Sequence, residues 1–178
     1  MRKELLNHFF STIIFFGILT VLNKFFNLGY WPFWAGGLVG SVLPDLDHVI
    51  YVYFLEPNDL NSQRFVYLRN QGNLSKALDI LAESCHGRIR LILHTTLFQW
   101  IFLILTYLVV STSTSLFAKG IVLSFSLHLL TDQFIDLLRL GTLDIWFKSV
   151  NLNLDKEKSL FYWLAMSLLL FFIGVIIL

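Results

Sequence analysis

Charged residues are scarce in this sequence: they make up 14% of its 178 residues, against about 25% in an average soluble domain. Hydrophobic residues make up 56%, so the chain lacks the polar surface that a soluble enzyme needs. The single cysteine, Cys85, excludes an internal disulfide and a cysteine-based zinc finger. A net charge of +1 gives no electrostatic basis for binding nucleic acid. These deficits predict an integral membrane protein.

Long apolar runs predict an all-α, polytopic membrane bundle that forms a single domain over residues 1–178. A bilayer core about 30 Å thick requires about 20 apolar residues per helical crossing, and none of the runs alternates as a strand would. The first run has no cleavage site after it and is expected to remain in the protein. The five expected spans are 5–22, 32–55, 91–110, 120–138 and 159–178.

The distribution of basic residues predicts how the five spans are oriented. All but two of the 13 lysines and arginines fall at the N-terminus, in the connection 56–90 or in the connection 139–158. The two exceptions are Lys24 and Lys119. Because cytoplasmic loops are rich in Lys and Arg, we expect a cytoplasmic-membrane protein with its N-terminus inside and its C-terminus outside. Within 56–90 we expect one short amphipathic helix on the membrane surface, from about Asn73 to His86.

Several ionisable residues lie inside the expected spans, where they are costly and usually functional. They are His8 in the first span; Asp45, Asp47 and His48 in the second; His94 in the third; and His128, Asp132 and Asp136 in the fourth. With the orientation above, all four helices bring these groups to the cytoplasmic half of the membrane. We therefore expect one polar centre, with membrane lipids around it.

The spacing of these residues favours a metal centre. His128 and Asp132 are separated by four positions and share one face of a helix, as do Asp45 and His48 at a separation of three. Asp47 points away from Asp45 in a regular helix, but Pro44 is expected to kink the helix there, which would allow Asp47 to turn inward as well. Nitrogen and oxygen ligands without thiolate suit Zn²⁺, with Mn²⁺ possible, and the number of ligands allows one or two ions.

Simpler interpretations stand beside this one. His128 and Asp132 form an interhelical hydrogen bond, Asp136 pairs with Arg139, or His8 is a packing residue near the membrane interface. His86 is expected on the surface. Three further residues are expected to be close-packing positions rather than a phosphate loop: Gly36, Gly37 and Gly40.

The segment from Gly40 to His48 resembles the G-x-x-L-P-D-x-D-H signature of the YdjM-type family of inner-membrane, metal-dependent hydrolases. His8 matches a histidine of that family at the start of its first span, and Ser126 to Asp132 resembles its later S-H-x-x-x-D element. Gly141 to Trp146 resembles the G-V-P-L-L-W that follows. One position departs: where the family has H-R-G-x-T-H-S, Arg90 and His94 are kept but Ile89 replaces the first histidine.

The resemblance implies metal-assisted hydrolysis at the cytoplasmic face, and the depth of the site suggests a phosphoester or a lipid-type ester as substrate. The expected metal ligands are His128, Asp132, Asp45, His48, His94 and His8. Asp47 or Asp136 would accept a proton, and Arg90 would hold a phosphate or carboxylate. Two alternatives remain: a metal-binding membrane scaffold without activity, favoured by Ile89, and an ion transporter.

Overall fold

The structure is a computed structural model that describes residues 2–83 and 91–177, and these residues contain helices and no strand. Five apolar helices form the main bundle. They are α1 (Arg2–Leu22), α2 (Trp31–Gly40), α6 (Thr96–Thr112), α7 (Leu116–Leu140) and α9 (Lys156–Phe172). The other α-helices are α3 (Leu46–Ile50), α4 (Leu60–Asn70), α5 (Leu74–Glu83) and α8 (Asp144–Phe147). Short 3-10 segments (η1, Leu28–Tyr30; η2, Leu43–Asp45; η5, Lys148–Val150) and π segments (η3, Tyr51–Leu55; η6, Ile173–Ile177) complete the helical order.

Three helical stretches are long and apolar enough to cross a membrane: Leu28–Leu55, Leu116–Leu140 and Lys156–Val175. Two further apolar helices, Leu6–Leu22 and Thr96–Thr112, are shorter. The predicted all-α fold is therefore confirmed. The stretches coincide broadly with the five runs that the sequence marks as spans.

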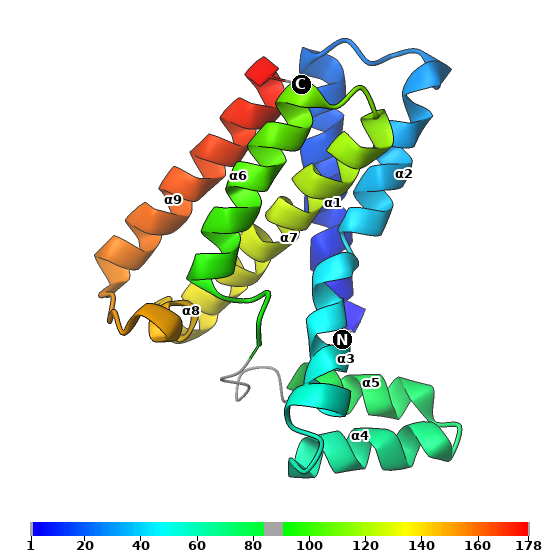
Figure 1. Cartoon of the computed structure of the whole chain (residues 1–178), viewed down its shortest axis with the longest axis vertical. Helices are drawn as coiled ribbons and strands as arrows, with labels where there is room; N and C mark the ends of the chain where they lie inside the picture. The colour runs from blue at the N-terminus through cyan, green and yellow to red at the C-terminus, as the bar shows by residue number, and fades with distance from the viewer. Residues whose placement is uncertain (1, 84–90, 178) are drawn as a thin grey trace.

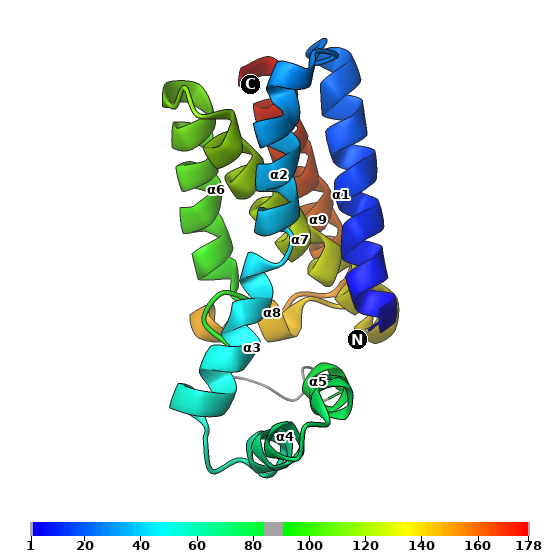
Figure 2. The same ribbon diagram turned by 90° about the vertical axis from the view of Figure 1, so that its right-hand side faces the viewer.

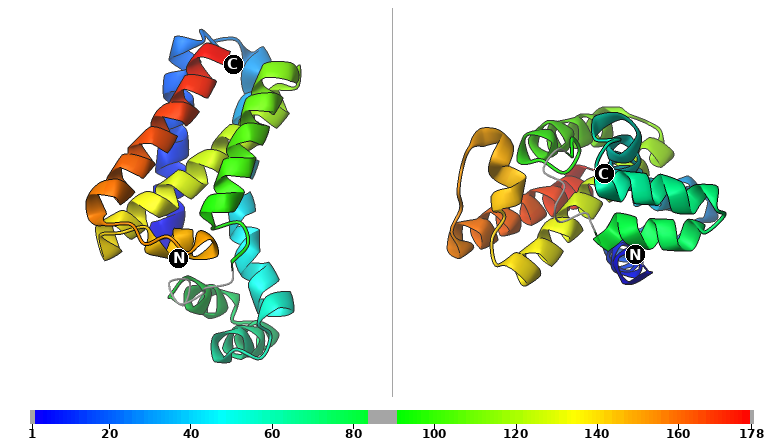
Figure 3. Two further views of the ribbon diagram at one scale, coloured as in Figure 1. Left: turned by 60° about the vertical axis from the view of Figure 1, so that its left-hand side comes forward. Right: turned by 90° about the horizontal axis from the view of Figure 1, so that it is seen from below.

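Helix α1 runs close to the long axis of the molecule, whereas α6, α7 and α9 are inclined to it, with α7 at the centre of the bundle (Figures 1 and 2). Helix α7 packs against α1, α2, α6 and α9. The N-terminus, the α4–α5 pair and α8 gather at one end, and the C-terminus lies at the other (Figures 1 and 3). The described parts of the connections 56–90 and 139–158 thus lie at the end that holds the N-terminus.

Glycines bring α2 unusually close to α7. A β-carbon at Gly36 would collide with the carbonyl oxygen of Phe117, and one at Gly40 would collide with the backbone of Ile121. A β-carbon at Gly37 would meet the Phe16 ring of α1. The prediction that these glycines are close-packing positions is confirmed, and the contact fixes α2 beside the first turns of α7.

The second expected span, 32–55, is not one continuous helix. Helix α2 ends at Gly40, and the chain continues through η2, α3 and the π segment η3. Pro44 lies within η2, where it cannot donate a backbone hydrogen bond to the preceding turn. The interruption turns Asp47 inward, as the kink at Pro44 allows, and leaves its side chain fully buried.

The third expected span, 91–110, also begins later than its apolar run suggests. Helix α6 starts at Thr96, and the Thr95 side chain caps it by accepting a hydrogen bond from the Phe98 amide. Residues 91–95 are non-helical. His94 therefore lies before the helix rather than in its first turn.

The expected amphipathic helix is present as α5, which begins at Leu74. It pairs with α4, a helix that the sequence did not suggest, and the two lie side by side when the molecule is seen along its axis (Figure 3). Buried Ala77 of α5 and Phe65 of α4 pack with Tyr51 and Val52 of η3. The remainder of the expected helix, including His86, lies outside the described residues.

Candidate metal centre

Helix α7 supplies the two residues at the heart of the centre. His128 and Asp132 lie one turn apart on the face that the spacing predicts, with His128 Nε2 3.2 Å from Asp132 Oδ2. The His128 residue is only 2% exposed. The Asp132 carboxylate keeps partial exposure, so the centre can be reached from outside the bundle.

Helix α1 brings His8 to the same carboxylate. His8 Nε2 lies 3.1 Å from Asp132 Oδ1. The His8 ring is stacked on that of His128, with centroids 3.8 Å apart and an interplanar angle of 4°. His8, His128 and Asp132 form a buried group that could hold a metal ion.

The non-helical segment 91–95 places a third imidazole beside this group. His94 Nε2 lies 3.1 Å from Asp132 Oδ2. Buried Asp47 holds the segment: one carboxylate oxygen accepts a hydrogen bond from the Ile92 amide, and the other accepts one from the Leu93 amide. The second oxygen also lies 3.2 Å from His94 Nδ1. Asp47 thus fixes both the backbone that carries His94 and the orientation of its ring.

A second carboxylate approaches from η2. Asp45 Oδ1 lies 3.7 Å from His128 Nε2, and the Asp45 side chain is 35% exposed. Segments far apart in the sequence therefore meet around Asp132: α1, η2, residues 91–95 and α7. The predicted convergence of His8, Asp45, His94, His128 and Asp132 is present.

Two contacts determine which ring nitrogens carry protons. His128 Nδ1 lies 2.6 Å from the carbonyl oxygen of Ser41, and because a carbonyl only accepts, this nitrogen must carry a hydrogen. Asp47, which already accepts two amide hydrogens, likewise accepts from His94 Nδ1. In neutral His94 and His128, the Nε2 lone pairs therefore point toward the centre.

Lone pairs that face a carboxylate repel it unless a cation lies between them. Protonating all three imidazoles would place two positive charges on the stacked rings of His8 and His128, which lie 3.8 Å apart. The buried His128 Nε2 also makes no well-directed hydrogen bond to any described group. A single divalent cation held by His8, His128 and Asp132 would offset the carboxylate charge and accept lone pairs from this group.

The spacing of the donor atoms fits such a cation. Ligands of a tetrahedral Zn²⁺ ion, each about 2.0–2.2 Å from the metal, lie roughly 3.3–3.6 Å from one another. The Nε2-to-oxygen distances in the centre run from 3.1 Å (His8 to Asp132) to 3.7 Å (His128 to Asp45). The donor set of imidazole nitrogen and carboxylate oxygen also suits Zn²⁺ or Mn²⁺.

The remaining predicted site residues take other positions. The His48 ring packs beside that of His94, with centroids 5.3 Å apart. Asp136 accepts a hydrogen bond from Trp146 Nε1 at 2.8 Å, and the Trp146 ring lies 5.7 Å from that of His94. Arg90 and Ile89 lie outside the described residues.

Sequence reasoning missed two contributors, Ser41 and Trp146. Ser41 acts through its backbone carbonyl, which any residue type provides, so no residue pattern could reveal it. Trp146 lies in the segment that carries the downstream part of the family resemblance, yet its indole was not linked to Asp136. No protein-family profile, curated protein or solved structure matches this chain.

Proposed function

We propose that this protein is a membrane-embedded, metal-dependent hydrolase that acts on a phosphoester or lipid-type ester at the cytoplasmic face. The observation that carries the proposal is the meeting of three imidazole Nε2 atoms on the Asp132 carboxylate, two of them with their Nδ1 atoms already engaged. The motifs that resemble the YdjM-type family contribute most of these residues.

In this proposal His8, His94, His128 and Asp132 hold the metal, and Asp45 is the nearest further oxygen donor. When bound there, a divalent metal would polarise the scissile oxygen and activate water for attack. The partial exposure of Asp132 and Asp45 leaves the centre open to water and substrate on one side.

Other residues act by positioning the ligands. Asp47 keeps the His94 ring in one tautomer and orientation, and the Ser41 carbonyl does the same for His128. Asp136 holds the Trp146 indole, which packs beside His94. We therefore assign Asp47 and Asp136 to orientation of the centre in place of proton transfer.

The proposal includes a topology of five crossings in the cytoplasmic membrane, with the N-terminus inside. The N-terminus and the α4–α5 pair share one end of the molecule with α8, while the C-terminus is at the other end. The basic connections belong to the first of these ends, which agrees with a cytoplasmic location for it. The centre would then lie near the depth of the cytoplasmic head groups.

The first experiment is the metal content of detergent-purified protein, measured by mass spectrometry beside a His128→Ala/Asp132→Ala double variant. The expected result is one or two equivalents of zinc or manganese in the wild type and none in the double variant. Asp79→Ala, which removes an exposed carboxylate on α5, is the matched control and should retain the metal. Absence of metal from wild-type protein, even after zinc is added, would overturn the proposal.

Metal-loaded protein should then hydrolyse a model phosphodiester or an ester lipid, and the double variant should not. The rival is a metal-stabilised scaffold, which is favoured by the arrangement of ligands on four separate segments of the chain. The scaffold predicts that chelation lowers the melting temperature while no substrate is turned over.

A further inference from the structure

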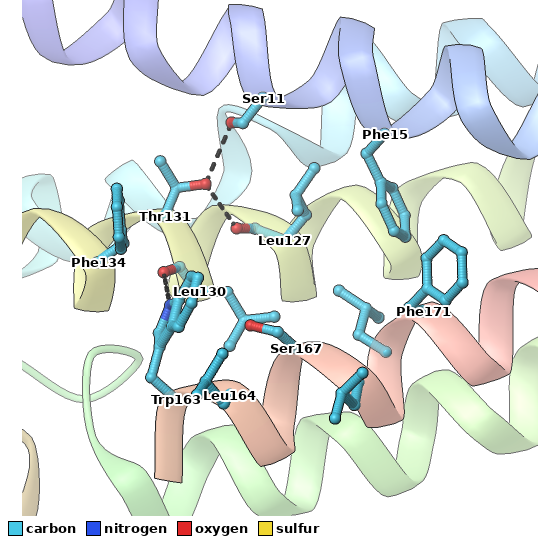
Figure 4. Close-up of a pocket in the computed structure, with 12 residues that line it drawn as sticks. Ser11, Phe15, Leu127, Leu130, Thr131, Phe134, Trp163, Leu164, Ser167 and Phe171 are labelled. Carbon is cyan, nitrogen blue, oxygen red and sulfur yellow. Dashed lines mark hydrogen bonds between the residues drawn. The ribbon is translucent and has the colours of Figure 1, made fainter. Parts of the chain in front are cut away.

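A second feature of the molecule lies against α7, between α1 and α9. A pocket of about 480 Å³ is bounded by α1, α7 and α9 (Figure 4). Its lining is almost entirely apolar and includes Phe15, Leu127, Phe134, Leu168 and Phe171. The volume lies within the range of about 300–1,000 Å³ that small-molecule sites usually have.

The pocket is open along its length to the outside of the bundle. Among its lining residues, Phe134 is 41% exposed, Leu164 45% and Leu168 67%. These residues belong to helices that are long and apolar enough to cross a membrane. In the proposed topology the opening therefore faces lipid hydrocarbon.

One end of the pocket is polar and adjoins the candidate metal centre. The Ser11 hydroxyl donates to the His8 carbonyl one turn earlier in α1, and it lies 3.1 Å from the Thr131 hydroxyl (Figure 4). Thr131 directly precedes Asp132 in α7. The same turns of α1 and α7 thus carry both the polar end of the pocket and the metal-binding group.

We propose that this pocket binds one acyl chain of a membrane lipid and so places the polar part of that lipid beside His8 and Asp132. That the bound lipid is the substrate rests on the proposed function. The apolar lining would hold the chain, while Ser11 and Thr131 mark the side of the pocket that is nearest to His8 and Asp132.

The dimensions of the pocket favour a single chain over a helix of a second copy. From Trp163 to Phe171 the lining follows α9 for about 12 Å, at about 1.5 Å per residue. Three helices of one chain bound this length, and the volume of about 480 Å³ is that of a site for a small molecule. A helix is about 10 Å or more in diameter, whereas an acyl chain is a single file of methylene groups, so the pocket suits the chain better.

The test uses the full-length protein in nanodiscs that contain phosphatidylethanolamine with a photoreactive diazirine on one acyl chain. After illumination, labelled residues are mapped by peptide mass spectrometry. We expect labelling to concentrate on Leu127, Phe134, Leu164 and Leu168, above that of lipid-exposed residues elsewhere, such as Phe161 or Leu108. Even labelling of all exposed apolar residues, or cross-links between two copies at the pocket, would overturn the proposal.

Two matched variants sharpen the test. Ser167→Phe fills the pocket from α9, whereas Leu169→Phe adds the same ring at an exposed position outside it. Ser167→Phe should abolish labelling of the pocket and Leu169→Phe should not, with metal content equal in both as evidence of an intact fold. If Ser167→Phe does not fold, the wild-type labelling map alone decides.

Hydrolysis separates this inference from the proposed function. With a long-chain ester we expect Ser167→Phe to raise KM by about tenfold, as a change in an apolar pocket can, and to leave a short-chain soluble ester unaffected. Pocket labelling without hydrolysis would support the lipid site and contradict the proposed hydrolase activity. Hydrolysis with the same KM in both variants, without preferential labelling of the pocket, would support the hydrolase activity and contradict the acyl-chain site.

Discussion

Helix α7 contributes neighbouring residues to two buried polar clusters. One cluster combines imidazoles with a carboxylate, and the other is made of neutral side chains. Asp132 faces the imidazoles of His8, His94 and His128. Gln133, the next residue, faces α6, where its side chain and that of Gln99 exchange two hydrogen bonds of 2.7 and 3.1 Å.

In the glutamine pair, the neutral side chains of Gln99 and Gln133 satisfy each other's hydrogen-bonding groups. Each carboxamide both donates and accepts, and the Tyr162 hydroxyl donates a further bond of 2.7 Å to Gln99. Around Asp132, by contrast, neutral His94 and His128 direct nitrogen lone pairs at a carboxylate. The comparison indicates that the first cluster joins helices, as polar residues in membrane bundles often do, whereas the second contains a group that could hold a cation.

The largest expected effect tests directly whether the cluster around Asp132 binds a cation. Asp132→Asn retains the shape of the side chain but removes the charge and one acceptor, so we expect metal affinity to fall by more than about 100-fold. Zinc titration of metal-free protein measures it. Gln133→Leu, a change at the adjacent residue, should leave the affinity unchanged. Equal losses in the two variants would show that the clusters do not differ in this way.

The next effect concerns the residue that orients His94. Asp47→Asn keeps the size of the buried side chain, but a carboxamide cannot accept all three hydrogen bonds from Ile92, Leu93 and His94. We expect a loss of about 10–100-fold in metal affinity, as is usual for residues that orient ligands. Asp79→Asn on α5 is the control.

Turnover distinguishes two roles for Asp47. If it orients His94, activity of Asp47→Asn should recover when enough zinc is added to fill the site. Full metal occupancy with no recovery of kcat would instead indicate that Asp47 accepts a proton in the reaction, as the sequence first suggested.

The parts of the centre that the sequence predicted are the local ones. His128 and Asp132 share a face because four residues make about one helical turn, and this holds in α7 whatever surrounds it. The meeting of His8 and His94 with this pair depended on a common depth in the membrane, which the apolar runs and basic connections supplied. Fold class followed from the same runs.

The parts that the sequence did not predict depend on tertiary contacts or on the backbone. Asp47 reaches the Ile92 and Leu93 amides only because the chain is not helical at 91–95. Pro44 indicates the break in the second span, whereas the apolar run continues across Thr95 and suggests a third span unbroken from residue 91. The Ser41 carbonyl carries no side-chain signal at all.

The smallest expected effect concerns the stability of the glutamine cluster. Gln133→Leu alone leaves the Gln99 carboxamide buried with lost partners, at a cost of about 1–3 kcal/mol in the free energy of unfolding; hydrogen bonds between membrane helices average about 0.6 kcal/mol, so the lower part of this range is expected. A fluorescence-detected melting curve in detergent measures it.

Removing the whole network should reverse most of that loss. In Gln99→Leu/Gln133→Leu/Tyr162→Phe no partner is left unpaired, and apolar side chains of similar size replace the three polar ones, an exchange that is often nearly neutral. The same treatment of the other cluster, with leucine at positions 128 and 132, would abolish metal binding whatever it did to stability. If the triple variant instead bound zinc more weakly than wild type, the two clusters would be coupled through α7, and Gln133 would belong to the support of the metal centre.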